Sequence, residues 1–263
     1  MDLLSSLNPE QQAAVRHTEG PLLILAGAGS GKTRVIAHRI AYLVSERVAH
    51  PDEVVAVTFT NKAAAEMRER VEALLNVNCR AMWISTFHAL CARLLRREAG
   101  HIGLSRDFTI YDSADQQAVV KQLVREYGLD EGAYQARVVL GRISHAKNRM
   151  EGPESFENTW NPRDREIGRL FHGYTKALTE ASALDFDDLL LKTVDLFEKN
   201  PSLRDRYARR FRFVMVDEYQ DTNRPQYLLV KQLAGGHRNL AVVGDPDQSI
   251  YKWRGADLRN IMD

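Results

Sequence analysis

Eight residues near the N-terminus have the types and spacing of a loop that binds phosphate groups. Residues 26–33 read AGAGSGKT, with three glycines and a final Lys-Thr pair. Glycines let a backbone turn tightly and bring its N–H groups close to phosphate oxygens. Lys32 is expected to reach the β- and γ-phosphates, and Thr33 to hold Mg²⁺. The expected nucleotide contacts are Gly27, Ala28, Gly29, Ser30, Gly31, Lys32 and Thr33. The alternative is a glycine-rich turn beside a solvated lysine.

Two adjacent carboxylates follow an apolar run later in the chain. Asp217 and Glu218 come directly after Phe213–Val216. A carboxylate at the tip of a buried strand, near a phosphate loop, suits coordination of Mg²⁺ through water. The next carboxylate can then polarise the attacking water as a general base. We expect Asp217 to serve the metal and Glu218 to be the base, which favours hydrolysis of ATP. The alternative is a pair of solvated carboxylates at a strand end.

A third polar segment follows the apolar run Leu240–Gly244. Gln248 could hydrogen-bond a γ-phosphate or its attacking water, so it joins Lys32 and Glu218 as an expected catalytic residue. Tyr251 and Trp253 alternate with basic residues, a pattern that suits stacking on single-stranded bases with neutralisation of the phosphates. The alternative is that both rings pack in the core.

These motifs fit an α/β fold in which a parallel sheet positions them. Continuous apolar runs of this length are typical of strands buried on both faces. Helical patterns follow the first three runs, and strand, turn and helix in repetition predict a doubly wound sheet. Ligands of such sheets gather at the carboxyl ends of the strands. The predicted strands are Leu22–Ala26, Val54–Phe59, Met82–Thr86, Phe213–Val216 and Leu240–Gly244, and the predicted helices are Thr33–Glu46, Asn61–Leu75 and Ala89–Glu98.

The stretch from about residue 90 to residue 205 has a different character. It carries amphipathic helical patterns and no comparable strand run, so an all-helical subdomain inserted into the α/β domain is expected. The predicted domains are residues 1–89 with 206–263, and residues 90–205. The helical patterns are Ser113–Tyr127, Ala136–Asn148, Arg163–Ala181 and Asp185–Glu198.

Composition narrows the class of protein further. The 36 Lys and Arg nearly balance the 35 Asp and Glu, which argues against a simple basic coat protein but leaves room for a local basic face. Cys79 and Cys91 lack zinc spacing and are expected to be buried or half-buried, so a disulfide scaffold is not indicated. Neither a signal peptide nor a membrane span is visible. A cytoplasmic protein is therefore expected.

Four motifs, in this order, resemble superfamily 1A DNA helicases of the UvrD/PcrA/Rep type. They are AGAGSGKTR at residues 26–34, TFTNKAA at 58–64, DEYQDTN at 217–223 and GDPDQSIY at 244–251. The resemblance covers essentially the whole chain. It implies a RecA-like P-loop NTPase domain, called 1A, with a helical insertion called 1B.

The resemblance also implies roles for individual residues. Gln11 looks like the glutamine that reads the adenine edge, and Arg34 like a further triphosphate contact. Gln248 matches the γ-phosphate sensor, and Arg254 the residue that couples the nucleotide site to DNA. The implied DNA contacts are Phe59, Asn61, His88, Phe186, Tyr251 and Trp253. For Phe186 an ordinary amphipathic helix face is the alternative.

The family resemblance implies an ATP-dependent DNA helicase or translocase that uses ATP and Mg²⁺. Expected partners are single-stranded DNA and single-strand/double-strand junctions, in repair or replication at the bacterial nucleoid. A second RecA-like lobe normally supplies arginine fingers, worth roughly 10³ to 10⁵ in rate, and has no counterpart in this chain. We therefore expect ATP and DNA binding without robust ATPase or unwinding activity. One alternative is a DNA- or partner-binding module without motor activity. Another is a phosphate-loop kinase, against which Glu218 and Gln248 argue.

Overall fold

The computed structural model describes residues 3–27, 29–79, 82–157 and 159–245, and the chain forms two units. Unit 1 comprises Met1–Leu90, Phe197–Thr222 and Gln226–Asp263, and unit 2 comprises Cys91–Leu196 and Asn223–Pro225. The domain boundaries expected from the sequence, after residues 89 and 205, stay a prediction. Each unit is described by itself below.

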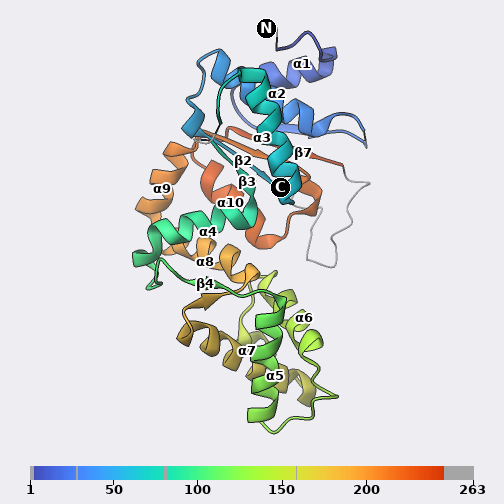
Figure 1. Ribbon diagram of the computed structural model, residues 1–263, viewed down its shortest axis with the longest axis vertical. Coiled ribbons are helices and arrows are strands. Elements are labelled where there is room, and N and C mark those ends of the chain that lie inside the picture. The colour runs from blue at the N-terminus through green and yellow to red at the C-terminus, as the bar shows by residue number, and fades with distance from the viewer. Residues whose placement is uncertain (1–2, 28, 80–81, 158, 246–263) are drawn as a thin grey trace. The chain divides into compact units, whose positions relative to one another are not determined.

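A parallel five-stranded sheet forms the centre of unit 1 (Figure 1). The strands lie in the order β1-β7-β6-β2-β3, and every neighbouring pair is parallel. This confirms the α/β class with a parallel sheet. The strands are β1 (Leu22–Leu25), β2 (Val54–Thr58), β3 (Trp83–Thr86), β6 (Phe213–Val216) and β7 (Leu240–Gly244). Pairing of Leu25 with Gly244, and of Val57 with Val216, brings the carboxyl ends of these strands to one edge.

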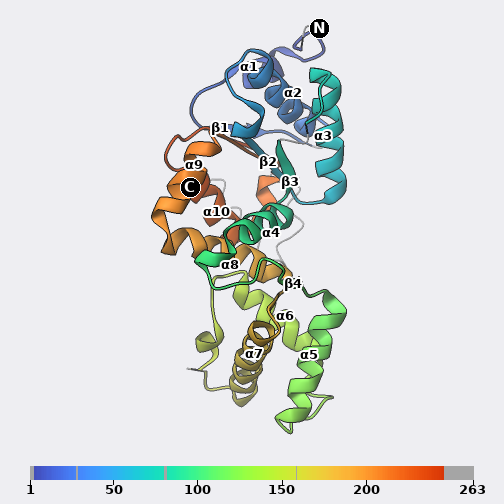
Figure 2. The same cartoon turned by 60° about the vertical axis from the view of Figure 1, so that its left-hand side comes forward.

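Helices cover both faces of this sheet. In Figures 1 and 2, α2 and α3 lie on one side of the strands, and α9 and α10 on the other. The helices of unit 1 are α1 (Pro9–Arg16), α2 (Lys32–Ser45), α3 (Asn61–Leu75), α9 (Pro201–Arg210) and most of α10 (Arg224–Ala234), with short 3-10 turns at Pro51–Glu53 and Tyr219–Asp221. Helices α4 (Phe87–Glu98) and α8 (Phe186–Lys199) each have residues in both units.

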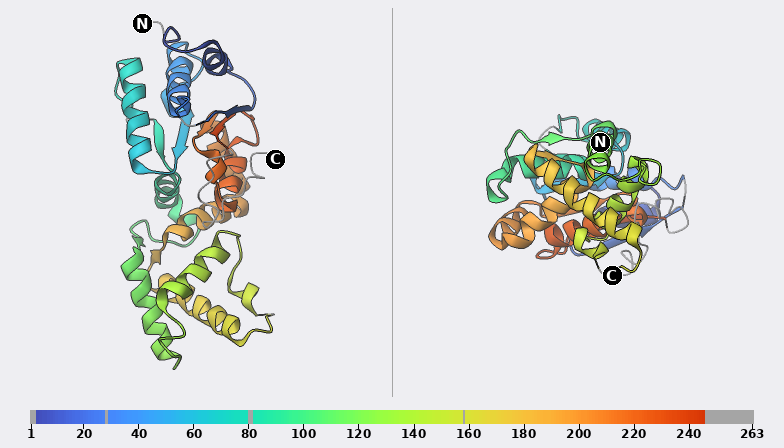
Figure 3. Two further views of the ribbon diagram at one scale, coloured as in Figure 1. Left: turned by 90° about the vertical axis from the view of Figure 1, so that its right-hand side faces the viewer. Right: turned by 90° about the horizontal axis from the view of Figure 1, so that it is seen from below.

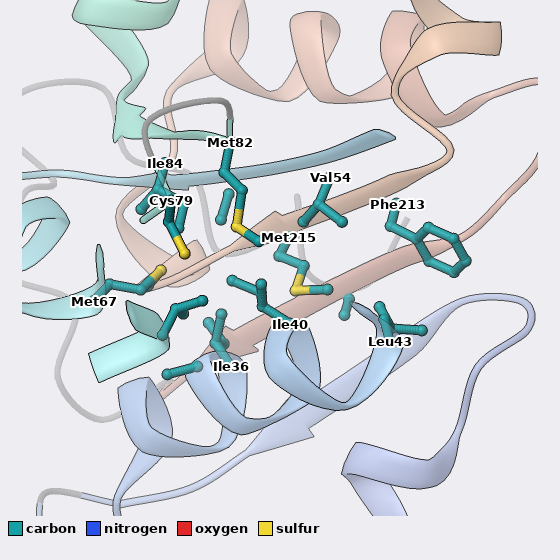
Figure 4. Close-up of a cluster of buried hydrophobic side chains, with 14 of the residues drawn as sticks. Ile36, Ile40, Leu43, Val54, Met67, Cys79, Met82, Ile84, Phe213 and Met215 are labelled. Carbon is teal, nitrogen blue, oxygen red and sulfur yellow. The ribbon is translucent and has the colours of Figure 1, made fainter. Parts of the chain in front are cut away.

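The main core of unit 1 lies between α2 and the sheet (Figure 4). Ile36, Ile40 and Leu43 recur at helical spacing along α2, so they share one face of the helix. That face meets Val54 of β2 and Met215 of β6, and all five side chains are buried. Each buried aliphatic side chain contributes about 1.5–3 kcal/mol, so this layer holds α2 and the loop before it in place.

Strand β1 departs from the expectation that every strand is buried on both faces. Leu23 is 45% exposed and Leu25 is 56% exposed, while their neighbours are half-buried. Strand β1 lies at one edge of the sheet, beside β7, whereas β3 at the other edge is largely buried. A continuous apolar run therefore predicted the strand correctly but not the burial of its outer face.

Unit 2 is built around three helices, α5 (Ser113–Glu126), α6 (Ala136–Lys147) and α7 (Pro162–Glu180). They pack on one another, as the green-to-yellow helices of Figure 3 show. The core includes Leu170 and Tyr174 of α7, both fully buried. Short 3-10 turns lie at Ala99–His101 and Pro153–Phe156.

One feature of unit 2 corrects the expectation of an all-helical insertion. Strand β4 (Thr109–Ile110) pairs in parallel with β5 (Ala183–Leu184) in a separate two-stranded sheet. Two-residue strands are too short to produce a periodic signal in the sequence. This small sheet anchors the chain just before α8.

Both cysteines are buried free thiols, as expected from the sequence. Burial raises the pKa of Cys91 to about 12, and burial also raises the pKa of Cys79. Within the described residues, no helix combines the length and the apolar character needed to cross a membrane.

Candidate functional site

The predicted phosphate loop connects the end of β1 to the start of α2. Gly29 and Gly31 have φ values of 73° and 84°, a left-handed conformation that favours glycine. Ser30 closes the loop on itself, because its N–H and its hydroxyl both donate to the Gly27 carbonyl, at 3.3 and 2.7 Å. The loop leads into α2 with Gly31 as the N-cap and Lys32 as the first helical residue. A helix N-terminus preceded by such a turn favours an anion.

Lys32 is a buried cation held between two carboxylates. Its side chain is 8% exposed, and Nζ lies 3.8 Å from Glu218 Oε2 and 3.8 Å from Asp245 Oδ2. Among the described residues, none accepts a hydrogen bond from this ammonium group. A buried ammonium group without hydrogen bonds is unfavourable, so the site suits an anionic ligand that supplies acceptors.

Asp217 lies directly beside the start of α2. The Thr33 hydroxyl donates to Asp217 Oδ2 at 2.9 Å, although the two residues are 184 positions apart. Asp217 is 2% exposed. Burial raises the pKa of this carboxyl, and the charge of Glu218 adds to that effect, while the Thr33 hydrogen bond opposes it. A cation bound here would offset the cost of the buried charge.

Glu218 is more open than Asp217 and is oriented by Gln220. Its side chain is 39% exposed, and its backbone takes a left-handed conformation with φ 52°. Gln220 Nε2 donates to Glu218 Oε2 at 2.7 Å, and Gln220 Oε1 accepts from the Asp245 backbone N–H at 3.0 Å. Gln220 is 1% exposed, so it fixes the Glu218 carboxylate from within the protein.

Gln11 contacts the phosphate loop, and Arg34, which follows the loop, contacts the N-terminal segment. Gln11 Nε2 donates to the Ser30 carbonyl at 3.0 Å, and Gln11 Oε1 accepts from the Asn8 N–H in a capping box at the start of α1. Arg34 donates to the Ser6 carbonyl at 2.9 Å. The structure thus places Gln11 against the phosphate loop, while its predicted adenine contact stays a prediction.

The second and third strand ends also lie along the carboxyl edge. Thr58 pairs with Thr86, so the residues that follow them are neighbours. The rings of Phe59 and Phe87 meet edge-to-face with centroids 5.7 Å apart. Phe59 and His88 are half-buried, and Asn61 is exposed at the first position of α3. Phe186 belongs to unit 2 and is 48% exposed at the first position of α8.

Several predicted site residues lie outside the described residues: Ala28, Gln248, Tyr251, Trp253 and Arg254. Their roles stay predictions. Sequence reasoning missed two residues that the structure brings to the site, Gln220 and Asp245. Asp245 could have been found from its position directly after a buried strand, the same signal that identified Asp217. Nothing in the sequence distinguished Gln220 from its polar neighbours.

Comparison with known proteins agrees with this architecture. Residues 7–263 match the family described as UvrD/REP helicase N-terminal domain, and the chain belongs to that family. It is similar to the ATP-dependent DNA helicase PcrA of Bacillus subtilis, with 52% identity over 99% of this chain and 35% of the relative. It is also similar to the proteins of the same name from Staphylococcus epidermidis and Staphylococcus aureus, each with 49% identity over 99% of this chain and 36% of the relative. The chain spans about a third of the length of these curated relatives.

Proposed function

We propose that this chain is the ATP-binding and single-stranded-DNA-binding part of an ATP-dependent DNA helicase or translocase. The observation that carries the proposal is the buried Lys32 ammonium, which lacks hydrogen bonds within the described protein and lies beside an open glycine loop. The phosphates of ATP supply the acceptors that Lys32 needs, and the N–H groups of the loop supply donors to the same phosphates.

Thr33 and Asp217 are the residues we assign to Mg²⁺. Both present oxygens, the ligand type that Mg²⁺ prefers, and they already contact each other. Within the described residues, no three His, Cys, Asp or Glu side chains are grouped to hold a metal on their own. In such sites Mg²⁺ is usually coordinated by one or two protein oxygens, with water and phosphate oxygens as the remaining ligands. The ion, when bound, neutralises charge on the phosphates.

Glu218 is the proposed general base. Its exposed carboxylate can accept a proton from water, and Gln220 holds one of its oxygens while leaving the other available. Lys32 stabilises charge that develops on the phosphates, and Gln248 is proposed to sense the γ-phosphate. Arg254 is proposed to connect this site to DNA.

Single-stranded DNA is the proposed partner of the aromatic and polar residues at the strand edge. Phe59 follows β2 directly, is half-buried and is supported edge-to-face by Phe87, and it is the proposed base-stacking ring at this edge. Asn61 and His88 are proposed contacts to the DNA backbone. The remaining proposed DNA contacts are Phe186, Tyr251 and Trp253. Junction DNA, action in repair or replication, and a place at the bacterial nucleoid belong to the same proposal.

The activity proposed for the 263 residues alone is limited. The relatives named as ATP-dependent DNA helicases are about three times as long as this chain. The resemblance assigns the arginine fingers to a second lobe, and such arginines contribute roughly 10³ to 10⁵ in rate. We therefore expect ATP and single-stranded DNA to bind while turnover stays slow.

The test is ATP hydrolysis by the chain with and without single-stranded DNA, beside Glu218→Gln as the control. Binding of an ATP analogue with turnover near background would support the proposal. If DNA stimulated turnover strongly and Glu218→Gln abolished it, another copy of the chain would be completing the active site. That result would contradict the limited activity proposed for the 263 residues. DNA binding without any nucleotide binding would favour a binding module instead.

A further inference from the structure

A buried polar cluster in unit 2 surrounds the start of α8, where Phe186 stands. We define the α8 cluster as Lys147, Tyr174, Asp185 and Asp188. Phe186 follows Asp185 directly and is 48% exposed. This inference rests on the proposed function, because it concerns how Phe186 is presented to DNA.

The two carboxylates of the α8 cluster cap the helix reciprocally. The Asp188 N–H donates to Asp185 Oδ1 at 2.8 Å, and the Asp185 N–H donates to Asp188 Oδ2 at 3.3 Å. This arrangement is a capping box, which fixes the backbone across the first turn of a helix. Phe186 lies inside that turn, so the cap sets the direction in which its side chain leaves the helix.

Lys147, the last residue of α6, clamps both carboxylates at once. Its Nζ donates to Asp185 Oδ2 and to Asp188 Oδ1, each at 2.7 Å. The side chains of Lys147 and Asp185 are 4% exposed, and that of Asp188 is 14% exposed. Burial alone would lower the pKa of Lys147, but the two carboxylates outweigh it and the pKa is raised. The lysine therefore stays charged within the cluster.

Tyr174 of α7 completes the cluster from another side. Its hydroxyl donates to Asp185 Oδ2 at 2.9 Å, and its ring centroid lies 5.3 Å from Lys147 Nζ. The backbone just before Asp185 is also held, because the Tyr111 N–H donates to the Leu184 carbonyl at 2.9 Å across the small sheet. Phe186 is thus preceded by a fixed strand and followed by a fixed helical turn.

Such a cluster adds little to the stability of a fold, but it restricts the positions of the residues that it joins. Removing ions from water is costly, and well-packed apolar residues often stabilise a fold as much as a buried ion pair does. A buried pair instead permits few alternative arrangements, because any other leaves a charge unpaired. We propose that Lys147 and Tyr174 are positioning residues that hold Phe186 outward as a platform on which a base of single-stranded DNA stacks.

The first test is a double-mutant cycle on affinity for a fluorescent oligodeoxythymidine, measured by anisotropy on the whole chain. Stacking on one aromatic side chain accounts for roughly 5- to 150-fold in affinity, so Phe186→Ala should weaken binding by that range. Tyr174→Phe removes one hydrogen bond to Asp185 and should weaken binding by part of that amount. In the Phe186→Ala background, Tyr174→Phe should have no further effect. Affinity for an ATP analogue should not change.

A matched control separates positioning from loss of stability. Ile167→Val changes a buried residue of the same helix, α7, outside the α8 cluster, and should leave DNA affinity unchanged. Lys147→Met should weaken DNA binding more than Tyr174→Phe does. If Lys147→Met does not fold, the Tyr174→Phe cycle still decides the question.

A spectroscopic reporter gives a second, independent reading. Phe186→Trp should show fluorescence quenching when the oligonucleotide binds, beyond that of the wild-type chain. Tyr174→Phe should reduce this extra quenching and Ile167→Val should not. Equal effects of Tyr174→Phe with and without Phe186 would overturn the inference alone. Full affinity in Phe186→Ala would overturn the inference and the proposed role of Phe186, but not the proposed binding of ATP and DNA by the chain. Failure of the wild-type chain to bind the oligonucleotide would overturn the DNA-binding proposal, and this inference with it.

Discussion

Asp187 should make the stability of the protein depend on pH in an unusual direction. Burial raises the pKa of its carboxyl to about 6, and the nearby charge of Asp185 adds to the effect. A hydrogen bond from Ser144 and the charge of Lys147 oppose the increase without cancelling it. The Asn148 side chain also donates to Asp187, at 3.3 Å. The folded chain therefore holds a proton on Asp187 at pH values where the unfolded chain releases it.

The sign and size of the effect follow from that difference. An unfolded carboxyl titrates near pH 4, so between about pH 4 and pH 6 the folded state binds more protons and stability falls as pH rises. The full cost, about 3 kcal/mol, is present above pH 6 and disappears as pH falls below 4. Asp187→Asn removes the charge and keeps an acceptor oxygen. It should raise the free energy of unfolding by about 1 kcal/mol at pH 4.5 and by about 3 kcal/mol at pH 7.5.

Urea unfolding followed by far-ultraviolet circular dichroism, at both pH values, measures this change. Asp107→Asn is the matched control, because Asp107 is exposed and the same substitution there should change stability equally at both pH values. If Asp187→Asn stabilised the chain equally at pH 4.5 and pH 7.5, or destabilised it at pH 7.5, the reasoning about its buried charge would be refuted.

Three further predictions concern other parts of the molecule. Gly31→Ala should weaken binding of an ATP analogue, because φ is 84° there and a left-handed backbone costs a non-glycine residue about 1–2 kcal/mol; unchanged affinity in a calorimetric titration would contradict this. Cys79 and Cys91 should not react with Ellman's reagent in the native protein, and both should react in guanidinium; rapid labelling of the native protein would contradict their burial. Ile40→Ala should lower the free energy of unfolding by about 2–5 kcal/mol in urea, and a loss below 1 kcal/mol would show that the core beneath α2 is not tightly packed.

Much of the sheet and of the candidate site at its carboxyl edge could be predicted from the sequence. Five continuous apolar runs coincided with the five strands of unit 1, and Asn61–Leu75 was predicted with the bounds that α3 has in the structure. Because ligands gather at the carboxyl ends of parallel strands, the sequence predicted that Asp217 and Thr33 lie close together. Their contact across 184 positions bears this out geometrically. Local patterns were sufficient here because each strand repeats the same relation between apolar run and polar turn.

Other features depend on contacts that no local pattern contains. The predicted helices did not include α1, which has eight residues, or α9, which begins at Pro201. Gln220 is defined by two partners, Glu218 and the Asp245 backbone, and only tertiary structure brings the second within reach.

Lys147 shows the same limit most clearly. Its position on an amphipathic helix was predicted, but its burial was not. Its two partners lie 38 and 41 residues further along the chain, in another helix and its cap. A lysine is rarely buried unless it is paired, and the pairing became visible only in three dimensions.

The most direct test of the account is a calorimetric titration of the chain with a non-hydrolysable ATP analogue in the presence of Mg²⁺. Saturable binding at one site is expected. Lys32→Met should weaken it roughly 10- to 150-fold, because hydrogen bonds to a charged group contribute about 1.5–3 kcal/mol. Lys176→Met, at an exposed position of unit 2, should bind as the wild-type chain does. Absence of saturable binding, or equal affinity in Lys32→Met, would contradict the assignment of this loop as a nucleotide site.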